Sequence, residues 1–228
     1  MPRPRVHDLD RVLDVAEQLV VDAGPERLTV RKLAAESGVP NGAIYHAFGS
    51  LGALRGRMWL RAAVEFLDLQ TALIDDALGA APGPEDARNA VVVAADAPAE
   101  LAARRPAAAR MLMTVRREQL LGPDLPEELA DSLLGLDRRL VSDVLCRLAM
   151  AMWGRRDGPS IEVITSCVVD LPTALLRRAL TQPAPGGAVQ VPADLRTRLA
   201  AAVRAVLDLE PPRRISSQGT THTDRKTT

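Results

Sequence analysis

The apolar positions of the chain recur every three or four residues, the spacing that places side chains on one face of an α-helix. The first such stripe runs through residues 6–23 and ends at Gly24. Segments rich in proline or glycine separate the later stripes. Those stripes predict helices over residues 50–78, 84–104, 106–121, 126–154, 160–181 and 193–209. The pattern therefore predicts an all-α fold.

Residues 28–54 predict two short helices joined by a tight turn. Thr29 can cap the first helix, because its hydroxyl can accept from the unpaired N–H groups of the opening turn. Gly38 ends that helix, since glycine adopts a positive φ without a Cβ clash, and a second helix can start near Pro40 or Asn41. This arrangement is typical of the helix-turn-helix motif.

The second short helix has one inward and one outward face. Ile44 and Phe48 lie four residues apart and can point into a small core. The other positions are small, polar or aromatic. Small residues permit close approach to base edges, and amide, phenol and imidazole groups can donate to bases or phosphates. The outward positions are Asn41, Gly42, Ala43, Tyr45 and His46.

The same segment resembles the N-terminal signature of the TetR-like (TetR/AcrR) family of bacterial transcriptional regulators. That signature has a T-x-x-x-L/I-A-x-x-A/S-G-V turn followed by a G-x-x-Y-x-x-F segment. The resemblance covers residues 8–60, and residues 16–24 look like the end of the family's first helix. The positions in register with the signature are Thr29, Leu33, Ala34, Ser37, Gly38, Val39, Gly42, Ile44, Tyr45, Phe48 and Leu54.

The resemblance implies two domains and a tail. Residues 1–50 are expected to form an N-terminal three-helix DNA-binding domain that contains the helix-turn-helix. Residues 51–210 are expected to form a larger C-terminal helical domain for ligand binding and dimerisation. Residues 211–228 are expected to be a disordered tail, because this segment has almost no apolar side chains to bury.

Two positions depart from the family pattern. Leu51 stands where relatives usually carry a lysine or arginine that is expected to contact a phosphate, and Ala47 is often a histidine in relatives. Because the formal net charge is +0, affinity for DNA is expected to depend on Arg31, Lys32 and the N-terminal arm. Two alternatives stay open: a helical hairpin that only packs in a core, and a helical ligand- or partner-binding dimer with degenerate DNA recognition.

The candidate DNA contacts combine the motif with nearby basic residues. Arg3 and Arg5 can follow a minor groove or the backbone, as the basic arms of other helix-turn-helix proteins do. Arg55 and Arg57, in the helix after the motif, are interpreted as solvated surface residues. The predicted DNA-binding residues are Thr29, Arg31, Lys32, Asn41, Gly42, Ala43, Tyr45, His46, Ser50, Arg3 and Arg5.

The larger domain is expected to be built from aliphatic side chains. Apolar residues make up 47% of the chain and aromatic residues 2%, so any ligand pocket is expected to be aliphatic and its effector small and apolar. Methionine suits an adaptable apolar cavity, although the same side chains can simply fill the core. The predicted pocket residues are Met111, Met113, Met150, Met152 and Trp153.

The sequence contains no catalytic or cofactor motif. His7, His46 and His222 are not placed for a shared site, and no phosphate-binding glycine loop occurs. Cys146 and Cys167 lack C-x-x-C spacing and are interpreted as buried small hydrophobic residues, with a redox-sensing thiol as the alternative. The chain is therefore expected not to be an enzyme and to need no metal or cofactor.

The family resemblance also implies a homodimer and a mode of regulation. The helices near residues 160–181 and 193–209 occupy the place of the family's dimer helices, and Pro172 is expected to bend the first of them. Two recognition helices about one DNA turn apart can read a palindrome. A ligand that changes this spacing would release a repressor from its operator, although an activator would use the same contacts.

No leader or membrane span is expected. The first ten residues carry charges with no apolar stretch behind them, and no uninterrupted run of about 18 apolar residues occurs. The protein is therefore expected to be cytoplasmic and not to bind a membrane. Its expected partners are double-stranded DNA, a small-molecule effector of unknown identity and a second copy of the chain.

Overall fold

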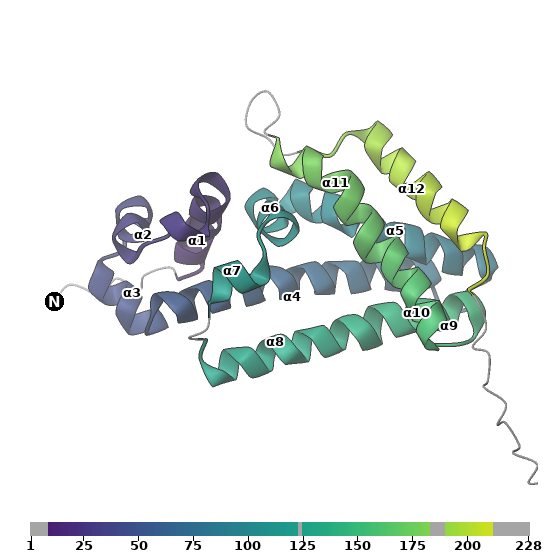
Figure 1. The fold of residues 1–228 in the computed structure, drawn as a ribbon, viewed down its shortest axis with the longest axis horizontal. Coiled ribbons are helices and arrows are strands. Elements are labelled where there is room, and N and C mark those ends of the chain that lie inside the picture. The colour runs from purple at the N-terminus through teal and green to yellow at the C-terminus, as the bar shows by residue number, and fades with distance from the viewer. Residues whose placement is uncertain (1–8, 123–124, 183–189, 212–228) are drawn as a thin grey trace, which may run out of the picture.

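A computed structural model of the chain describes residues 9–122, 125–182 and 190–211. Within these residues every regular element is a helix, which confirms the predicted all-α fold. Figure 1 shows a small N-terminal group of short helices beside a larger bundle, with one long helix running from the first group into the second. The predictions for Arg3, Arg5 and the tail from residue 212 lie outside the described residues.

The small N-terminal group follows the predicted pattern. It contains α1 (Leu9–Ala23), a 3₁₀ turn (Pro25–Arg27), α2 (Val30–Ser37) and α3 (Asn41–Phe48). The apolar stripe of α1 is buried against α2 and the start of the next long helix. Gly24 follows α1 with a φ of 88°, so the predicted stop is confirmed.

Helix α4 (Leu51–Leu78) belongs to both groups of helices. Its first half buries Leu54 and Met58 in the same hydrophobic cluster as α1, α2 and α3. Its second half buries Leu67 and Ile74 in the cluster of the larger bundle. The core of the small group therefore extends past residue 50 into α4.

Helix α5 (Pro84–Arg104) lies at the centre of the larger bundle. It packs against α4 and against four later helices, which are α6 (Pro106–Thr114), α9 (Arg147–Trp153), α11 (Leu171–Thr181) and α12 (Ala193–Leu207). Its buried face is made largely of alanine, which lets neighbouring backbones approach closely. The fully or almost fully buried alanines of α5 are Ala87, Ala90, Ala94, Ala95, Ala97, Ala99 and Ala102.

One buried polar contact in this bundle has a clear cause. Pro98 lies inside α5 and has no N–H to donate to the carbonyl of Ala94, four residues earlier. The side chain of Gln70, which is 1% exposed on α4, donates from Nε2 to that carbonyl oxygen at 2.8 Å. The glutamine thus supplies the donor that the proline removes.

The predicted helix over residues 106–121 is wrong in one respect. It consists of α6 (Pro106–Thr114) and α7 (Arg117–Leu121), separated at Val115, whose φ of −99° and ψ of 130° are extended. The break redirects the chain so that Leu120 and Leu121 are buried in the N-terminal cluster. No proline or glycine marks this break, so the sequence pattern did not reveal it.

The next predicted helix, over residues 126–154, forms as an unbroken helical run. It contains α8 (Glu127–Arg139), a π-helical turn (Leu140–Cys146) and α9 (Arg147–Trp153). Gly154 ends the run in the left-handed conformation, with a φ of 63°. Figure 1 shows α8 running beneath α4 towards the far end of the bundle.

The helical run Gly158–Thr181 is also continuous. It contains α10 (Gly158–Thr165), a π-helical turn (Ser166–Asp170) and α11 (Leu171–Thr181). The π-helical turn comes directly before Pro172, at the place where the sequence predicted a disturbed helix. By length and composition alone, this run is apolar enough to cross a membrane, which the sequence reading had not anticipated.

Helix α12 (Ala193–Leu207) completes the described part of the bundle. Leu199, Val203 and Leu207 face inward and are buried. Arg196 pairs with Asp96 and also with Glu100 on α5, and its Nε donates to Asp96 Oδ2 at 2.9 Å. Both apolar and ionic contacts therefore hold α12 against α5.

Candidate nucleic-acid interface

The predicted helix-turn-helix is present with the expected local geometry. The Thr29 hydroxyl accepts from the Lys32 backbone N–H at 3.2 Å and so caps α2. Gly38 follows α2 in the left-handed conformation, with a φ of 72°. The Ser37 hydroxyl accepts from the Val39 backbone N–H at 3.3 Å inside the turn. Together these contacts fix the direction in which α3 leaves α2.

Helix α3 is divided into the two predicted faces. Ile44 is 1% exposed and Phe48 is 5% exposed, so both lie in the N-terminal core. Tyr45 is 52% exposed and His46 is also exposed. A large aromatic side chain left in solvent on a short helix is available for contact with a partner.

The candidate DNA contacts gather on the beginning of α2, on α3 and at the entry to α4. Lys32 and Ala43 are half-buried, and the Ser50 hydroxyl accepts from the Ala53 backbone N–H at 3.0 Å to cap α4. Among the described residues, neither Arg31 nor Lys32 forms an ion pair, so both charges are available to phosphates. The exposed members are Thr29, Arg31, Asn41, Gly42, Tyr45, His46 and Ser50.

Arg55 is not the solvated residue that the sequence predicted, whereas Arg57 is exposed as predicted but also makes a hydrogen bond. Arg55 Nη2 donates to the carbonyl oxygens of Pro25 at 2.9 Å and Leu28 at 3.3 Å. Arg57 Nη1 donates to the carbonyl oxygen of Ala47 at 3.2 Å, although Arg57 itself is exposed. Both arginines therefore hold the short helices against α4, because each satisfies carbonyls at the end of another element.

The two departures from the family pattern have a structural use in this chain. Ala47 and Leu51 are both half-buried and pack against the N-terminal core. Leu51 therefore supports the packing of α4 against that core. Any phosphate contact at the entry to α4 must come from neighbouring groups such as Ser50.

A cluster of charged side chains joins the N-terminal helices to the larger bundle. Glu17 of α1 is 1% exposed and lies between two arginines. Arg61 Nη2, on α4, donates to Glu17 Oε1 at 2.6 Å. Arg105 Nη2, at the corner between α5 and α6, donates to Glu17 Oε2 at 3.0 Å, and its Nη1 donates to Glu65 Oε1 at 2.9 Å. Arg105 thus contacts α1 and α4 at once.

Burial dominates the electrostatics of Glu17. Desolvation raises the pKa of its carboxyl group, and the hydrogen bonds and charges of Arg61 and Arg105 offset this only in part. This cluster was not predicted from the sequence, although Glu17 lies among Leu13, Ala16 and Val20 on the apolar stripe of α1. A charged residue on such a stripe was the available signal.

The five predicted pocket residues do not share one cavity. Met111 is fully buried in the N-terminal cluster, whereas Met113 lies beside a cavity of about 20 Å³ at the α4–α5–α6 contact. Met152 and Trp153 are partly buried against the core of the larger bundle. Met150 is 44% exposed. Their participation in effector binding stays a prediction.

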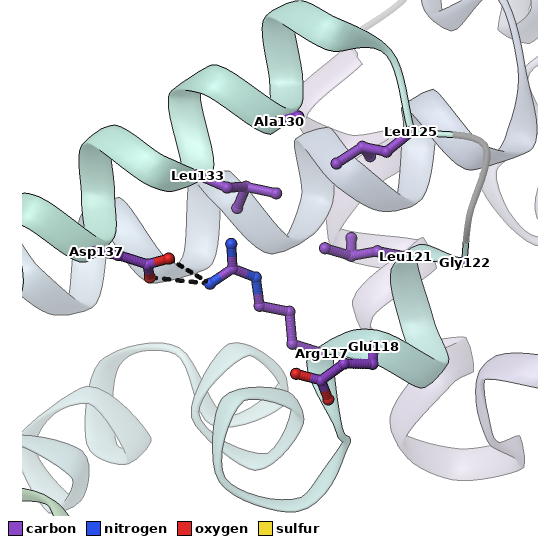
Figure 2. A pocket seen from close by; sticks show the side chains of 8 residues that line it. All are labelled: Arg117, Glu118, Leu121, Gly122, Leu125, Ala130, Leu133 and Asp137. Atoms are coloured by element: carbon purple, nitrogen blue, oxygen red, sulfur yellow. Dashed lines mark hydrogen bonds and ion pairs between the residues drawn. The ribbon is translucent and has the colours of Figure 1, made fainter.

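A larger cavity, of about 580 Å³, lies between α7 and α8 (Figure 2). Arg117 Nη1 donates to both carboxylate oxygens of Asp137, at 2.9 Å and 3.1 Å, and so connects the two helices across it. The remaining lining is largely apolar. The lining residues are Arg117, Glu118, Leu121, Gly122, Leu125, Ala130, Leu133 and Asp137.

The described residues offer no obvious metal or redox centre. Within them, no group of three or more histidine, cysteine, aspartate or glutamate side chains could hold a metal ion. Cys167 is buried, and burial raises the pKa of its thiol to about 12. Cys146 is half-buried, which differs from the prediction that both cysteines lie in the core. Cys167 therefore stays protonated, and thiolate chemistry is disfavoured there.

Comparison with known proteins agrees with the geometry of the N-terminal helices. Residues 12–57 match the model of a family described as bacterial regulatory proteins, tetR family. A search of curated proteins finds no match. The matched residues include α2, α3 and the turn between them.

Solved structures of transcriptional regulators share the fold of most of the chain. FadR, a transcriptional regulator from Bacillus subtilis in complex with stearoyl-CoA, is 15% identical with a TM-score of 0.60, over 88% of this chain and 97% of FadR. PfmR, a TetR-family transcriptional regulator from Thermus thermophilus, is 20% identical with a TM-score of 0.56, over 90% of this chain and 98% of PfmR. At these identities the likeness shows the fold alone.

The helix-turn-helix and the family match define a DNA-binding protein of the helix-turn-helix class. Residues 12–57 thus form an N-terminal DNA-binding domain that matches the tetR family model, followed by a larger helical domain whose fold resembles that of solved transcriptional regulators.

Proposed function

We propose that this protein is a ligand-responsive repressor that binds a palindromic operator as a homodimer. The observation that carries the proposal is the exposed face of α3, which presents Tyr45, His46 and Asn41 on a helix held by a glycine turn and by arginine-to-carbonyl contacts. Helices positioned in this way can enter a major groove and contact base edges. Such a regulator works on chromosomal DNA, and a cytoplasmic location follows from that role.

Arg31 and Lys32 supply the sequence-independent part of binding. Their charges lie at the start of α2, which packs against α3, and have no ion-pair partner among the described residues. Contacts of this kind neutralise phosphates, release counterions and weaken steeply as salt is raised. The neutral chain thus binds DNA through a local patch.

Homodimerisation through residues 158–181 and α12 is supported by what these helices leave exposed. Only 33% of the most apolar window of Gly158–Thr181 is buried within the chain, and Val169 is 37% exposed. The outer face of α12 carries exposed small residues at four-residue spacing, Thr197, Ala201 and Ala205. Such faces can approach a second copy closely, and a two-fold axis would pair each face with itself.

The charge cluster around Arg105 provides a route from the larger bundle to the DNA-binding helices. Arg105 lies at the α5–α6 corner and binds Glu17 of α1 and Glu65 of α4. A ligand that binds better to one position of this corner would shift α1 and α4, and with them the spacing of the two recognition helices. Release from the operator follows from that change in spacing.

The test is selection of bound sequences from a randomised double-stranded DNA library, with Tyr45→Ala and Glu36→Ala proteins run in parallel. Glu36 is exposed on α2, is not among the predicted contacts, and serves as the matched control. The wild type and the Glu36→Ala protein are expected to recover the same palindrome, and Tyr45→Ala is expected to lose it. Absence of enrichment at low salt would favour a helical dimer that no longer reads DNA.

A further inference from the structure

We propose that the cavity between α7 and α8 is the effector site of this chain and takes a neutral, largely apolar molecule with one hydrogen-bond acceptor, such as a ketone or ester carbonyl. The proposal rests on the proposed function, because it identifies the effector class of the same regulator. The cavity volume of about 580 Å³ falls within the usual range for small-molecule sites.

Three leucines from three segments supply the apolar part of the site. Leu121 comes from α7, Leu125 from the connection between the helices, and Leu133 from α8 (Figure 2). Leu121 and Leu133 are buried and Leu125 is half-buried. An alkyl or alicyclic body that lies against these side chains leaves water for an apolar surface, which favours binding.

Arg117 supplies the polar contact. One of its terminal nitrogens, Nη1, is taken up by Asp137. Figure 2 shows the other terminal nitrogen pointing towards the leucine-lined part of the cavity, on the side of Leu133. Because a guanidinium has five N–H donors, it can donate to a ligand carbonyl while it keeps the bond to Asp137.

The charges of the lining favour a neutral ligand. The cavity is lined by one guanidinium, that of Arg117, and by two carboxylates, those of Glu118 and Asp137. An anionic head group would therefore meet a net negative lining. A cationic head group in the leucine-lined part would meet Arg117 first, because Figure 2 shows Glu118 on the other side of Arg117 from the three leucines.

The same site contacts the helix that carries the DNA-binding domain. A Cβ atom at Gly56 of α4 would lie 2.7 Å from Leu125 Cδ1 and 2.9 Å from Leu129 Cδ1, so these leucines lie directly on the α4 backbone. Leu125 thus contacts both the cavity and α4. A ligand that displaces Leu125 changes the packing on the part of α4 that holds the short helices through Arg55 and Arg57.

The experiment is isothermal titration calorimetry of the full chain with three probes of equal carbon number, below their micelle-forming concentrations. The probes are decan-2-one, decylamine and decanoic acid. The proteins are the wild type, Arg117→Lys and Arg116→Lys. Arg117→Lys keeps the charge opposite Asp137 but loses the forked donor, and the exposed Arg116 does not line the cavity.

The ketone is expected to bind the wild type about tenfold more tightly than either charged probe, and Arg117→Lys is expected to lose about tenfold in affinity for it, as for loss of a hydrogen bond from a charged donor. Arg116→Lys is expected to bind like the wild type. Tighter binding of the amine or the acid, or unchanged ketone binding by Arg117→Lys, would overturn the proposal.

A DNA measurement separates this proposal from the proposed function. The ligand-free wild type is tested on the operator recovered by selection, and the ketone is then added. Operator binding that the ketone does not weaken would overturn the effector proposal and leave the DNA reader intact. Failure of the ligand-free protein to bind any operator would instead overturn the proposed function, whereas the calorimetry is independent of DNA.

Discussion

The two ends of α4 lie in regions that are built differently. Around its first half, long-range hydrogen bonds and left-handed glycines position short helices, as with Arg55 on Pro25 and Leu28 and with Gly38 after α2. Around its second half, the long helix α5 brings its neighbours close through buried alanines. The contacts of the first region fix the direction of α3, the predicted DNA-reading helix. Those of the second region fix the distances between α5 and the helices packed on it.

This difference predicts that the larger bundle is most sensitive to added volume. Ala90→Leu places a large side chain at a fully buried position on α5 and is expected to cost about 3 kcal/mol of unfolding free energy, because a well-packed core cannot accept the extra methylenes. Urea unfolding measures this cost. Ala35→Leu, at an exposed position on α2, is the control and is expected to change stability little. Equal costs at the two positions would contradict the comparison.

The contact between the two regions is expected to depend on pH. Arg105→Met leaves the buried Glu17 carboxylate with Arg61 and is expected to cost about 2 kcal/mol at neutral pH. The variant's Glu17 pKa rises further above its ordinary value, so stability is lost as pH rises through that pKa. The difference from the wild type should therefore shrink as the pH is lowered.

Unfolding by urea at a series of pH values measures this difference. Glu17→Gln introduced into the Arg105→Met protein removes the buried charge that only Arg61 still offsets, and it is expected to recover part of the lost stability at neutral pH. A cost that is independent of pH, or that Glu17→Gln increases, would show that Arg105 acts through packing alone.

A smaller loss of stability is expected from removing the hydrogen bond between Gln70 of α4 and the Ala94 carbonyl of α5. Gln70→Leu removes the donor to Ala94 and should cost about 1–2 kcal/mol, because a buried carbonyl is left unpaired. Pro98→Ala restores a helical N–H, so the double variant should recover much of this loss. Urea unfolding of both single variants and of the double variant gives the coupling free energy between positions 70 and 98. If the effects of the two substitutions on unfolding free energy simply add, the Gln70 side chain does not replace the N–H that Pro98 lacks.

Substitution of two glycines, one in each region, is expected to have the smallest effects on stability. Gly38→Ala is expected to cost about 1 kcal/mol, because only a left-handed backbone allows the turn there. Gly135→Ala, within α8 and with open space around its Cβ position, is expected to gain about 0.5–1 kcal/mol through helix propensity. Thermal unfolding should therefore show shifts of opposite sign, and shifts of one sign would remove the distinction.

The N-terminal region was the more predictable one because its signals are local. The cap at Thr29, the turn at Gly38 and the inward pair Ile44 and Phe48 lie within twenty residues of one another and were all confirmed. The interpretation of Arg55 as a solvated residue failed because its partners lie 27 and 30 residues away. A bond of that span leaves no periodic trace in a sequence.

The helices of the larger domain were predicted from the sequence, but its ligand cavity was not. Each apolar stripe gave a helix, yet the break at Val115 carries no proline or glycine and was missed. The methionines were grouped by residue type, whereas Met111 and Met113 lie in different clusters. The cavity beside Arg117 depends on the pairing with Asp137, twenty residues away, and therefore on how α7 and α8 are each placed against α4.

The proposed function requires that α3 reads DNA in a two-fold dimer. The most direct measurement is the mass of the complex formed on the selected operator, combined with hydroxyl-radical footprinting of both strands. We expect two protomers per operator and two protected half-sites about one DNA turn apart, and we expect both to be lost with Tyr45→Ala, because Tyr45 is exposed on α3. A single protomer on one half-site, or a footprint that Tyr45→Ala leaves unchanged, would contradict it.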